Sequence, residues 1–113
     1  RLTNALITII KSGEKNMKLN VEEFMETEMG IELKATVTAW DRALSKRRKD
    51  VDGLGFYHWD SICRECLSKW DVFKLAIKQF YGIEFCFTRT DDYFGACTED
   101  ESVWLMKVYR KEE

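Results

Sequence analysis

The stretch "WDSICRECLSKWDVFKLAIKQFYG", residues 59–82, decides the fold of this chain. Its large apolar side chains recur in steps of four and three residues, which is the spacing of one face of an α-helix. The positions are Trp59, Cys63, Cys66, Trp70, Phe73, Ile77 and Phe80. At about 1.5 Å per residue, a helix of about 60–81 would span about 33 Å, the diameter of a small domain. The pattern therefore predicts one long central helix, ended by Gly82.

The residues that follow this helix predict a sheet. Three runs rich in β-branched and aromatic residues are separated by two acidic turns. The runs are 83–89, 93–98 and 103–110. Consecutive strands joined by such short turns pair antiparallel. We therefore expect a three-stranded antiparallel meander over about 83–110, packed on the long helix.

Turn length also predicts how the strands pair, if Asp91-Asp92 and Asp100-Glu101 are two-residue hairpin loops. The predicted pairs are Cys86 with Cys97, Cys97 with Trp104, and Ala96 with Leu105. One face would carry Phe85, Phe87, Phe94, Ala96, Val103, Leu105 and Tyr109, and the other Cys86, Cys97, Trp104, Met106 and Val108. We expect the long helix to cover the first face. The second is too apolar to stay fully wet, so the N-terminal helices or a partner would cover it.

Helices are also predicted before residue 50. Asn20 and Glu23 form a capping box that opens a helix, and Gly30 is its expected end. Residues 31–50 fit a strand by alternation, but apolar residues at steps of four, three and four favour a helix over about 34–49. The chain 1–113 is thus expected to be a single α+β domain, with helices first and the sheet last.

Composition narrows the class of protein. The chain has 113 residues with 45% apolar and 13% aromatic content, which suits one domain with a real core. Its net charge of −2 argues against wholesale nucleic-acid binding.

The apolar stretch 5–10 is too short to cross a membrane and lacks a signal-peptide cleavage pattern. Four cysteines are too few for a disulfide scaffold, so we expect a reducing, cytoplasmic setting. Residues 1–16 are interpreted as a possible N-terminal extension before a natural start at Met17.

The cysteines raise two alternatives. Cys63 and Cys66 lie three residues apart on the long helix, and Cys86 and Cys97 are predicted to face each other on adjacent strands. Four such sulfurs suit tetrahedral Zn²⁺, with His58 as a possible substitute ligand. Core packing of the two helical thiols is the favoured interpretation, because both share the apolar stripe. We therefore expect no cofactor and keep a zinc-stabilised domain as an alternative.

Catalysis is not predicted. The Cys-x-x-Cys pair lacks the strand that leads into a thioredoxin-type motif. The chain has one histidine, and no glycine-rich oxyanion loop stands near a cysteine. The paired carboxylates fall at helix starts and turns, where capping and solubility explain them. The sequence indicates a protein that is not an enzyme.

A basic run keeps nucleic-acid binding as a second alternative. It consists of Arg42, Lys46, Arg47, Arg48 and Lys49, and aromatic residues follow soon after. Cations beside stacking rings are what single-strand binding requires. Cations at a helix C-terminus also complement the helix dipole, and the chain holds 20 acidic against 18 basic residues. A solvated helix end is therefore the favoured interpretation of the run.

Protein binding is the leading functional hypothesis. Four Trp, four Tyr and seven Phe are more aromatics than one small core readily hides, and exposed aromatics anchor interfaces. The expected partner-binding residues are Trp104 and Met106 on one sheet face, and Phe56, Tyr57 and Trp59 in a loop before the long helix. In length and composition the chain resembles small accessory proteins of phages and mobile elements, which implies a regulatory or inhibitory role toward a host protein.

Overall fold

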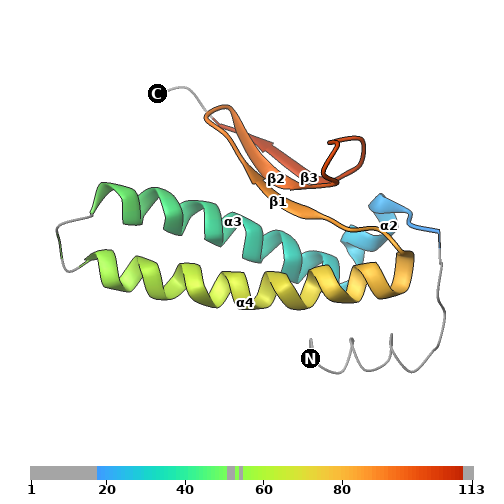
Figure 1. Cartoon of the computed structure of the whole chain (residues 1–113), viewed down its shortest axis with the longest axis horizontal. Helices are drawn as coiled ribbons and strands as arrows, with labels where there is room; N and C mark the ends of the chain where they lie inside the picture. Colours follow the sequence, from blue (N-terminus) through green and yellow to red (C-terminus); the bar gives the residue numbers. More distant parts are fainter. Residues whose placement is uncertain (1–17, 51–52, 54, 111–113) are drawn as a thin grey trace.

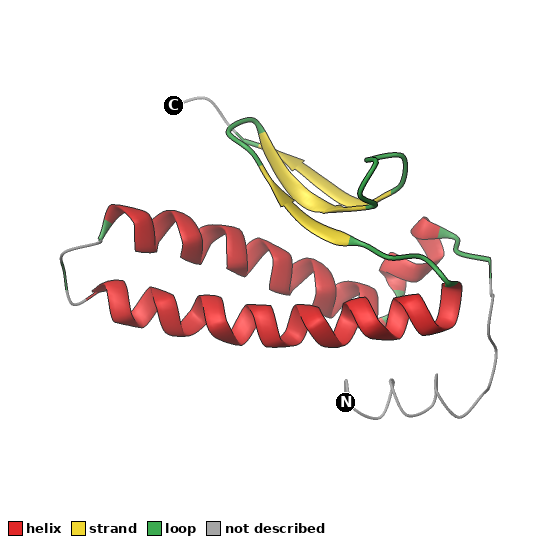
Figure 2. Cartoon of the chain, viewed as in Figure 1, coloured by secondary structure: helices red, strands yellow, loops and turns green. Residues whose placement is uncertain are grey.

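Two long helices and a C-terminal sheet make up the computed structural model, which describes residues 18–50, 53 and 55–110 (Figure 1). The helices are α2 (Val21–Glu26), α3 (Glu28–Lys49) and α4 (Gly55–Tyr81), and the strands are β1 (Cys86–Arg89), β2 (Tyr93–Cys97) and β3 (Trp104–Tyr109). Helices α3 and α4 run side by side in opposite directions, and the sheet lies over α3 in the views of Figures 1 and 2. The predicted extension before Met17 lies outside the described residues.

The predicted α+β class is confirmed. The three strands pair antiparallel in the order β1-β2-β3, and the long helix ends at Tyr81. Gly82 terminates it with φ 72°, a left-handed conformation that glycine adopts without steric cost. None of the helices in the described ranges combines the length and apolarity that a bilayer-spanning segment requires.

Helix α4 begins at Gly55, about five residues before the predicted start. The loop predicted around Phe56, Tyr57 and Trp59 is therefore wrong, because these residues form the first turns of α4. Turn residues such as Gly53 and Gly55 suggested a longer loop, but a glycine is tolerated at the end of a helix that packing stabilises along its length.

The prediction that Gly30 ends a helix is also wrong. The break falls earlier, at Thr27, whose side chain accepts a hydrogen bond from the Gly30 amide (3.1 Å) and caps α3. A Cβ at residue 30 would lie 2.2 Å from the Phe24 carbonyl oxygen, so glycine is needed for close contact between α2 and α3. The helical interpretation of residues 34–49 is confirmed, and α3 starts earlier, at Glu28.

The core lies between the helix pair and the inner face of the sheet, which is the face toward the helices. It is formed by buried side chains of α2, α3, α4 and the strands: Phe24, Met29, Leu33, Val37, Trp70, Phe73, Ala76, Ile77, Phe85, Phe94, Ala96, Leu105 and Met106. Five of the seven predicted stripe positions of α4 are buried, while Trp59 and Phe80 at its ends are half-buried. The stripe of α4 therefore faces the core as predicted, but the helix that lies next to the sheet is α3, so the expected cover of the sheet face by the long helix is wrong.

The strand register is confirmed in part. Cys86 pairs with Cys97, and Cys97 pairs with Trp104. Ala96 pairs with Met106 rather than with Leu105, because β3 carries one extra residue at this point. Such a β-bulge moves every later side chain to the opposite face.

The bulge changes the two predicted faces of the sheet. Met106 is only 8% exposed and joins the core with the neighbouring Leu105, and Val108 packs against the same core. Tyr109 moves to the outer face of the sheet, which is the face away from the helices, and is 66% exposed. The predicted sharing of one face by Trp104 and Met106 is therefore wrong.

A cluster of charges ties α3 to the sheet. Asp41 of α3 is 8% exposed, and its carboxylate accepts hydrogen bonds from Arg89 at 2.8 Å and from Arg110 at 2.7 and 3.1 Å. Arg89 also donates to Ser45, and Arg110 donates to the Thr90 carbonyl. The hydrogen bonds to the Asp41 carboxylate raise the pKa of the Arg110 guanidinium. One carboxylate thus holds β1 and the end of β3 on the helix.

We expect Asp41→Asn to destabilise the protein by about 2–3 kcal/mol, because it leaves two half-buried guanidinium groups without their carboxylate. The free energy of unfolding, measured by urea denaturation, checks this. Asp71→Asn is the matched control, since Asp71 is exposed on α4, and it should change stability by less than about 0.5 kcal/mol. Equal effects of the two variants would show that the Asp41 cluster contributes nothing.

Candidate functional site

The outer face of the sheet carries an aromatic cluster, defined here as Tyr93, Trp104 and Tyr109 around Lys107. Tyr93 lies on β2 and the other residues lie on β3. Helices cover the inner face, whereas no element of the described chain lies over the outer face in Figure 2. Aromatic side chains gathered on an uncovered face are typical of an interaction site.

The rings are arranged around the lysine ammonium. The Tyr93 ring centroid lies 5.6 Å from that of Trp104 and 6.0 Å from that of Tyr109, both edge to face. The Lys107 Nζ lies 4.3 Å from the Tyr93 centroid, 4.6 Å from the Trp104 centroid and 5.1 Å from the Tyr109 centroid. All three distances are in the range of cation–π attraction. Gly95 pairs with Lys107 and adds no side chain between the rings.

The turn between β2 and β3 holds the rings in place. Glu101 has φ 59°, and its carbonyl oxygen accepts a hydrogen bond from the Trp104 indole at 3.1 Å. Its carboxylate accepts a hydrogen bond from the Tyr93 hydroxyl at 3.0 Å, which raises the pKa of Tyr93. Hydrogen bonds from Ser102 and Thr98 lower the pKa of Asp100 to about 2, so this carboxylate is ionised at neutral pH. The turn is therefore hydrogen-bonded on both sides of the strained residue.

Carboxylates flank the aromatic cluster at both ends of the sheet. We call them the acidic rim, which consists of Asp91 and Asp92 in the first turn and Glu99, Asp100 and Glu101 in the second. All five residues are exposed, and none forms an ion pair within the part of the chain that the structure describes. Arg89 and Arg110 engage Asp41 beneath the sheet. Among the described residues, the outer face is therefore acidic around the exposed Lys107.

The structure separates the predicted partner-binding residues. Trp104 belongs to the aromatic cluster, and Met106 lies in the core. Tyr57 is 75% exposed, and Phe56 and Trp59 beside it are half-buried. These three residues lie on α4, which Figure 1 places on the side of α3 away from the sheet. The predicted residues therefore do not form one surface.

The sequence pattern did not predict Tyr93, Lys107 or Tyr109 as members of the site. Strict alternation from Trp104 places Lys107 and Tyr109 on the face opposite to Trp104, so the pattern hid the cluster. The bulge in β3 brings Trp104, Lys107 and Tyr109 to the same face. The available signal was Gly95 in the middle of a strand, since an isolated glycine there often accompanies a bulge or a close backbone contact.

The residues of the basic run differ in their contacts and exposure. Arg47 donates to Asp60 of α4 at 2.7 Å, so it joins the two long helices. Lys46, Arg48 and Lys49 are exposed at the end of α3. They lie at the same end of the helix pair as the start of α4, where Tyr57 is found (Figure 1). Cations and an exposed aromatic ring thus share this end.

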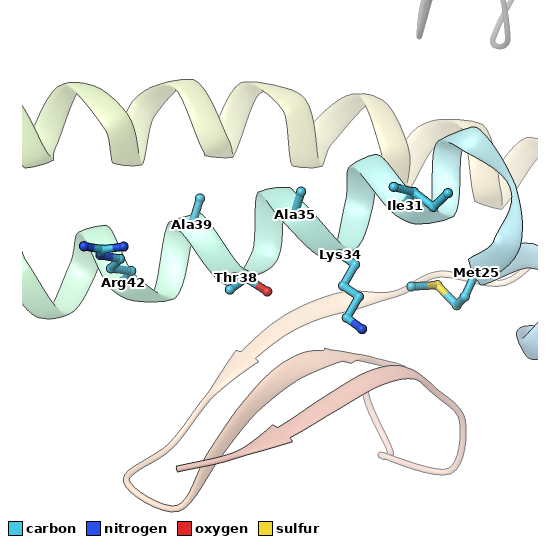
Figure 3. A pocket seen from close by; sticks show the side chains of 7 residues that line it. All are labelled: Met25, Ile31, Lys34, Ala35, Thr38, Ala39 and Arg42. Carbon is cyan, nitrogen blue, oxygen red and sulfur yellow. The ribbon is translucent and has the colours of Figure 1, made fainter. Parts of the chain in front are cut away.

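Arg42 lies apart from the end of α3 and lines a shallow hollow on the exposed side of the helix (Figure 3). The other lining residues are Met25, Ile31, Lys34, Ala35, Thr38 and Ala39. Short side chains form its floor, and Figure 3 shows Arg42 and Met25 at its two ends. The hollow has no aromatic lining, so it offers no stacking platform to a nucleic-acid base.

The four predicted zinc ligands do not converge. Cys63 and Cys66 are buried on α4, and burial is the main cause that raises the pKa of both thiols. Cys86 and Cys97 pair across β1 and β2, and Cys97 lies 3.2 Å from the Thr88 hydroxyl. All four are free thiols. Within the described residues, no three His, Cys, Asp or Glu side chains are grouped to hold a metal ion.

Comparisons of the chain with protein-family models, with curated proteins and with solved structures gave no match. A fold by itself does not specify an activity, so the residues of the site carry the functional inference. The site offers rings, one caged ammonium and a rim of carboxylates. These groups suit non-covalent recognition.

The thiols differ in burial, and this predicts an order of alkylation. We expect iodoacetamide at pH 8 to modify half-buried Cys86 first, and to modify Cys63 and Cys66 only after unfolding in urea. Alkylation needs the thiolate, which burial disfavours at the two helical sites. Peptide mass spectrometry measures the order. Rapid labelling of Cys63 in the folded protein would contradict its place in the core.

Proposed function

We propose that this chain is a non-enzymatic protein that binds a protein partner through the outer face of its sheet. The observation that carries the proposal is the aromatic cluster on that face, in which Tyr109 is exposed and Tyr93 and Trp104 are half-buried. In line with the resemblance to small accessory proteins, the proposed role is regulatory or inhibitory, of the phage or mobile-element type. The free thiols support a reducing, cytoplasmic setting for this role.

The chemistry of the aromatic cluster supports recognition of a protein. Tyrosine and tryptophan dominate interface hot spots because they bury large areas and have few rotatable bonds to immobilise. Tyr109 is 66% exposed and has that area to bury. Hydrogen bonds to Glu101 fix Tyr93 and Trp104 in advance, which lowers the entropic cost of binding.

Nucleic-acid binding is the second candidate, and it would use a different surface. The acidic rim repels phosphate at both ends of the sheet, which argues against the outer face. The exposed cations Lys46, Arg48 and Lys49 lie at one end of the helix pair, with Tyr57 nearby. A stacking ring beside cations supports single-strand binding there.

Variants of exposed tyrosines separate the two surfaces. We expect Tyr109→Ala to weaken binding of the partner at least about tenfold, because it removes a hot-spot ring. The partner is first identified by affinity purification with mass spectrometry, and its affinity for each purified variant is then measured by calorimetry. Tyr57→Ala is the matched control, since it removes an equally exposed tyrosine from the far side of α3.

The outcomes of this experiment are distinct. Trp104→Ala should also lose binding, and its urea midpoint tells whether the sheet remains folded. If neither Tyr109→Ala nor Trp104→Ala weakens binding, the outer face is not the interface. Steeply salt-dependent binding to an oligonucleotide, lost in the double variant Arg48→Ala and Lys49→Ala, would favour the second candidate.

A further inference from the structure

The aromatic cluster already holds a cation, its own Lys107. The ammonium lies within 5.1 Å of all three ring centroids, and the nearest is Tyr93 at 4.3 Å. An ammonium near several ring faces is attracted by the negative quadrupole of each ring. The cluster is therefore shaped to accept a positively charged side chain.

The three rings hold the Lys107 ammonium, and its hydrogen bond with Tyr109 raises the pKa of Lys107. Lys107 is exposed, and it forms no ion pair within the described residues. Cation–π attraction is weak at an exposed site, and the four-carbon stem of lysine is flexible. Another cation can therefore take the place of Lys107 at small cost, while Lys107 swings into water.

The acidic rim favours a positively charged partner. Asp91 and Asp92 lie at one end of the sheet, and Glu99, Asp100 and Glu101 lie at the other (Figure 1). Complementary potentials speed association and disfavour partners of like charge. A basic segment that crosses the outer face would meet carboxylates at both ends and rings in the middle.

We propose that the aromatic cluster binds a lysine or arginine side chain of a basic segment of the protein partner, which displaces Lys107. This inference rests on the proposed function and names the chemistry of the partner. Lys107 then acts as an internal competitor that keeps the rings occupied until a partner binds. The carboxylates of the acidic rim take further basic residues of the same segment.

Removal of the competitor tests the inference. The probe is fluorescein-labelled hexalysine, and its binding to the full chain is followed by fluorescence anisotropy at low ionic strength. Lys107→Met should bind the probe about two- to fivefold more tightly than Lys46→Met, the range expected from the cation–π term. Lys46→Met makes the same change in net charge at an exposed site on α3, away from the cluster. Adding Tyr109→Ala should abolish the gain.

Three results would overturn the inference. The first is equal binding of the two Lys→Met variants, which would mean that net charge alone acts. The second is no detectable hexalysine binding to Lys107→Met. The third is binding of a single-stranded oligothymidine that Lys107→Met weakens, because the outer face would then recognise nucleic acid. A captured partner that requires Tyr109 while hexalysine fails would remove the basic-segment inference alone, whereas a partner indifferent to Tyr109 would remove the proposed function too.

Discussion

The extra residue in β3 is the constraint on which the sheet and its site both depend. Between Trp104 and Met106, Leu105 has no partner on β2, and every residue after it changes face. Two consecutive residues, Leu105 and Met106, are thereby buried against the helices. A regular strand would bury one of them and expose the other. The same shift sends Lys107 and Tyr109 outward, so core and candidate site have one common cause.

Asp41 is the second constraint, because it binds two arginines on the helix side of the sheet and so keeps their charge away from the outer face. The side chains of Arg89 and Arg110 extend from the sheet toward α3, and both form ion pairs with the Asp41 carboxylate. The carboxylates of the acidic rim stay exposed, and within the described residues none of them forms an ion pair with Arg89 or Arg110. In the described part of the chain, Lys107 is the cation of the outer face, and its nearest partners are the aromatic rings. The acidic character of this face thus follows from the way the sheet is fastened to α3.

The elements were predictable from sequence where many side chains contribute to one pattern. Seven apolar residues from Trp59 to Phe80 share the helical spacing, and the long helix that they predict is confirmed. The face assignments in β3 depended on one residue, and alternation assumes that no residue is extra. The prediction that Gly30 ends a helix was wrong for a similar reason. Glycine is required there by a close contact with α2, which the local sequence does not reveal. Errors therefore arose where tertiary contacts override a local rule.

Trp104 was the only residue of the aromatic cluster that the sequence singled out, and this has a physical reason. A tryptophan is conspicuous in any register, but Tyr93, Lys107 and Tyr109 acquire meaning only from the strand pairing that gathers them. Preorganisation explains why the gathering matters for binding. Rings fixed by Glu101 lose little entropy when a partner covers them, whereas the same residues on a flexible loop would lose more. The strained conformation of Glu101 is consistent with this role, since strain persists where surrounding hydrogen bonds over-determine a site.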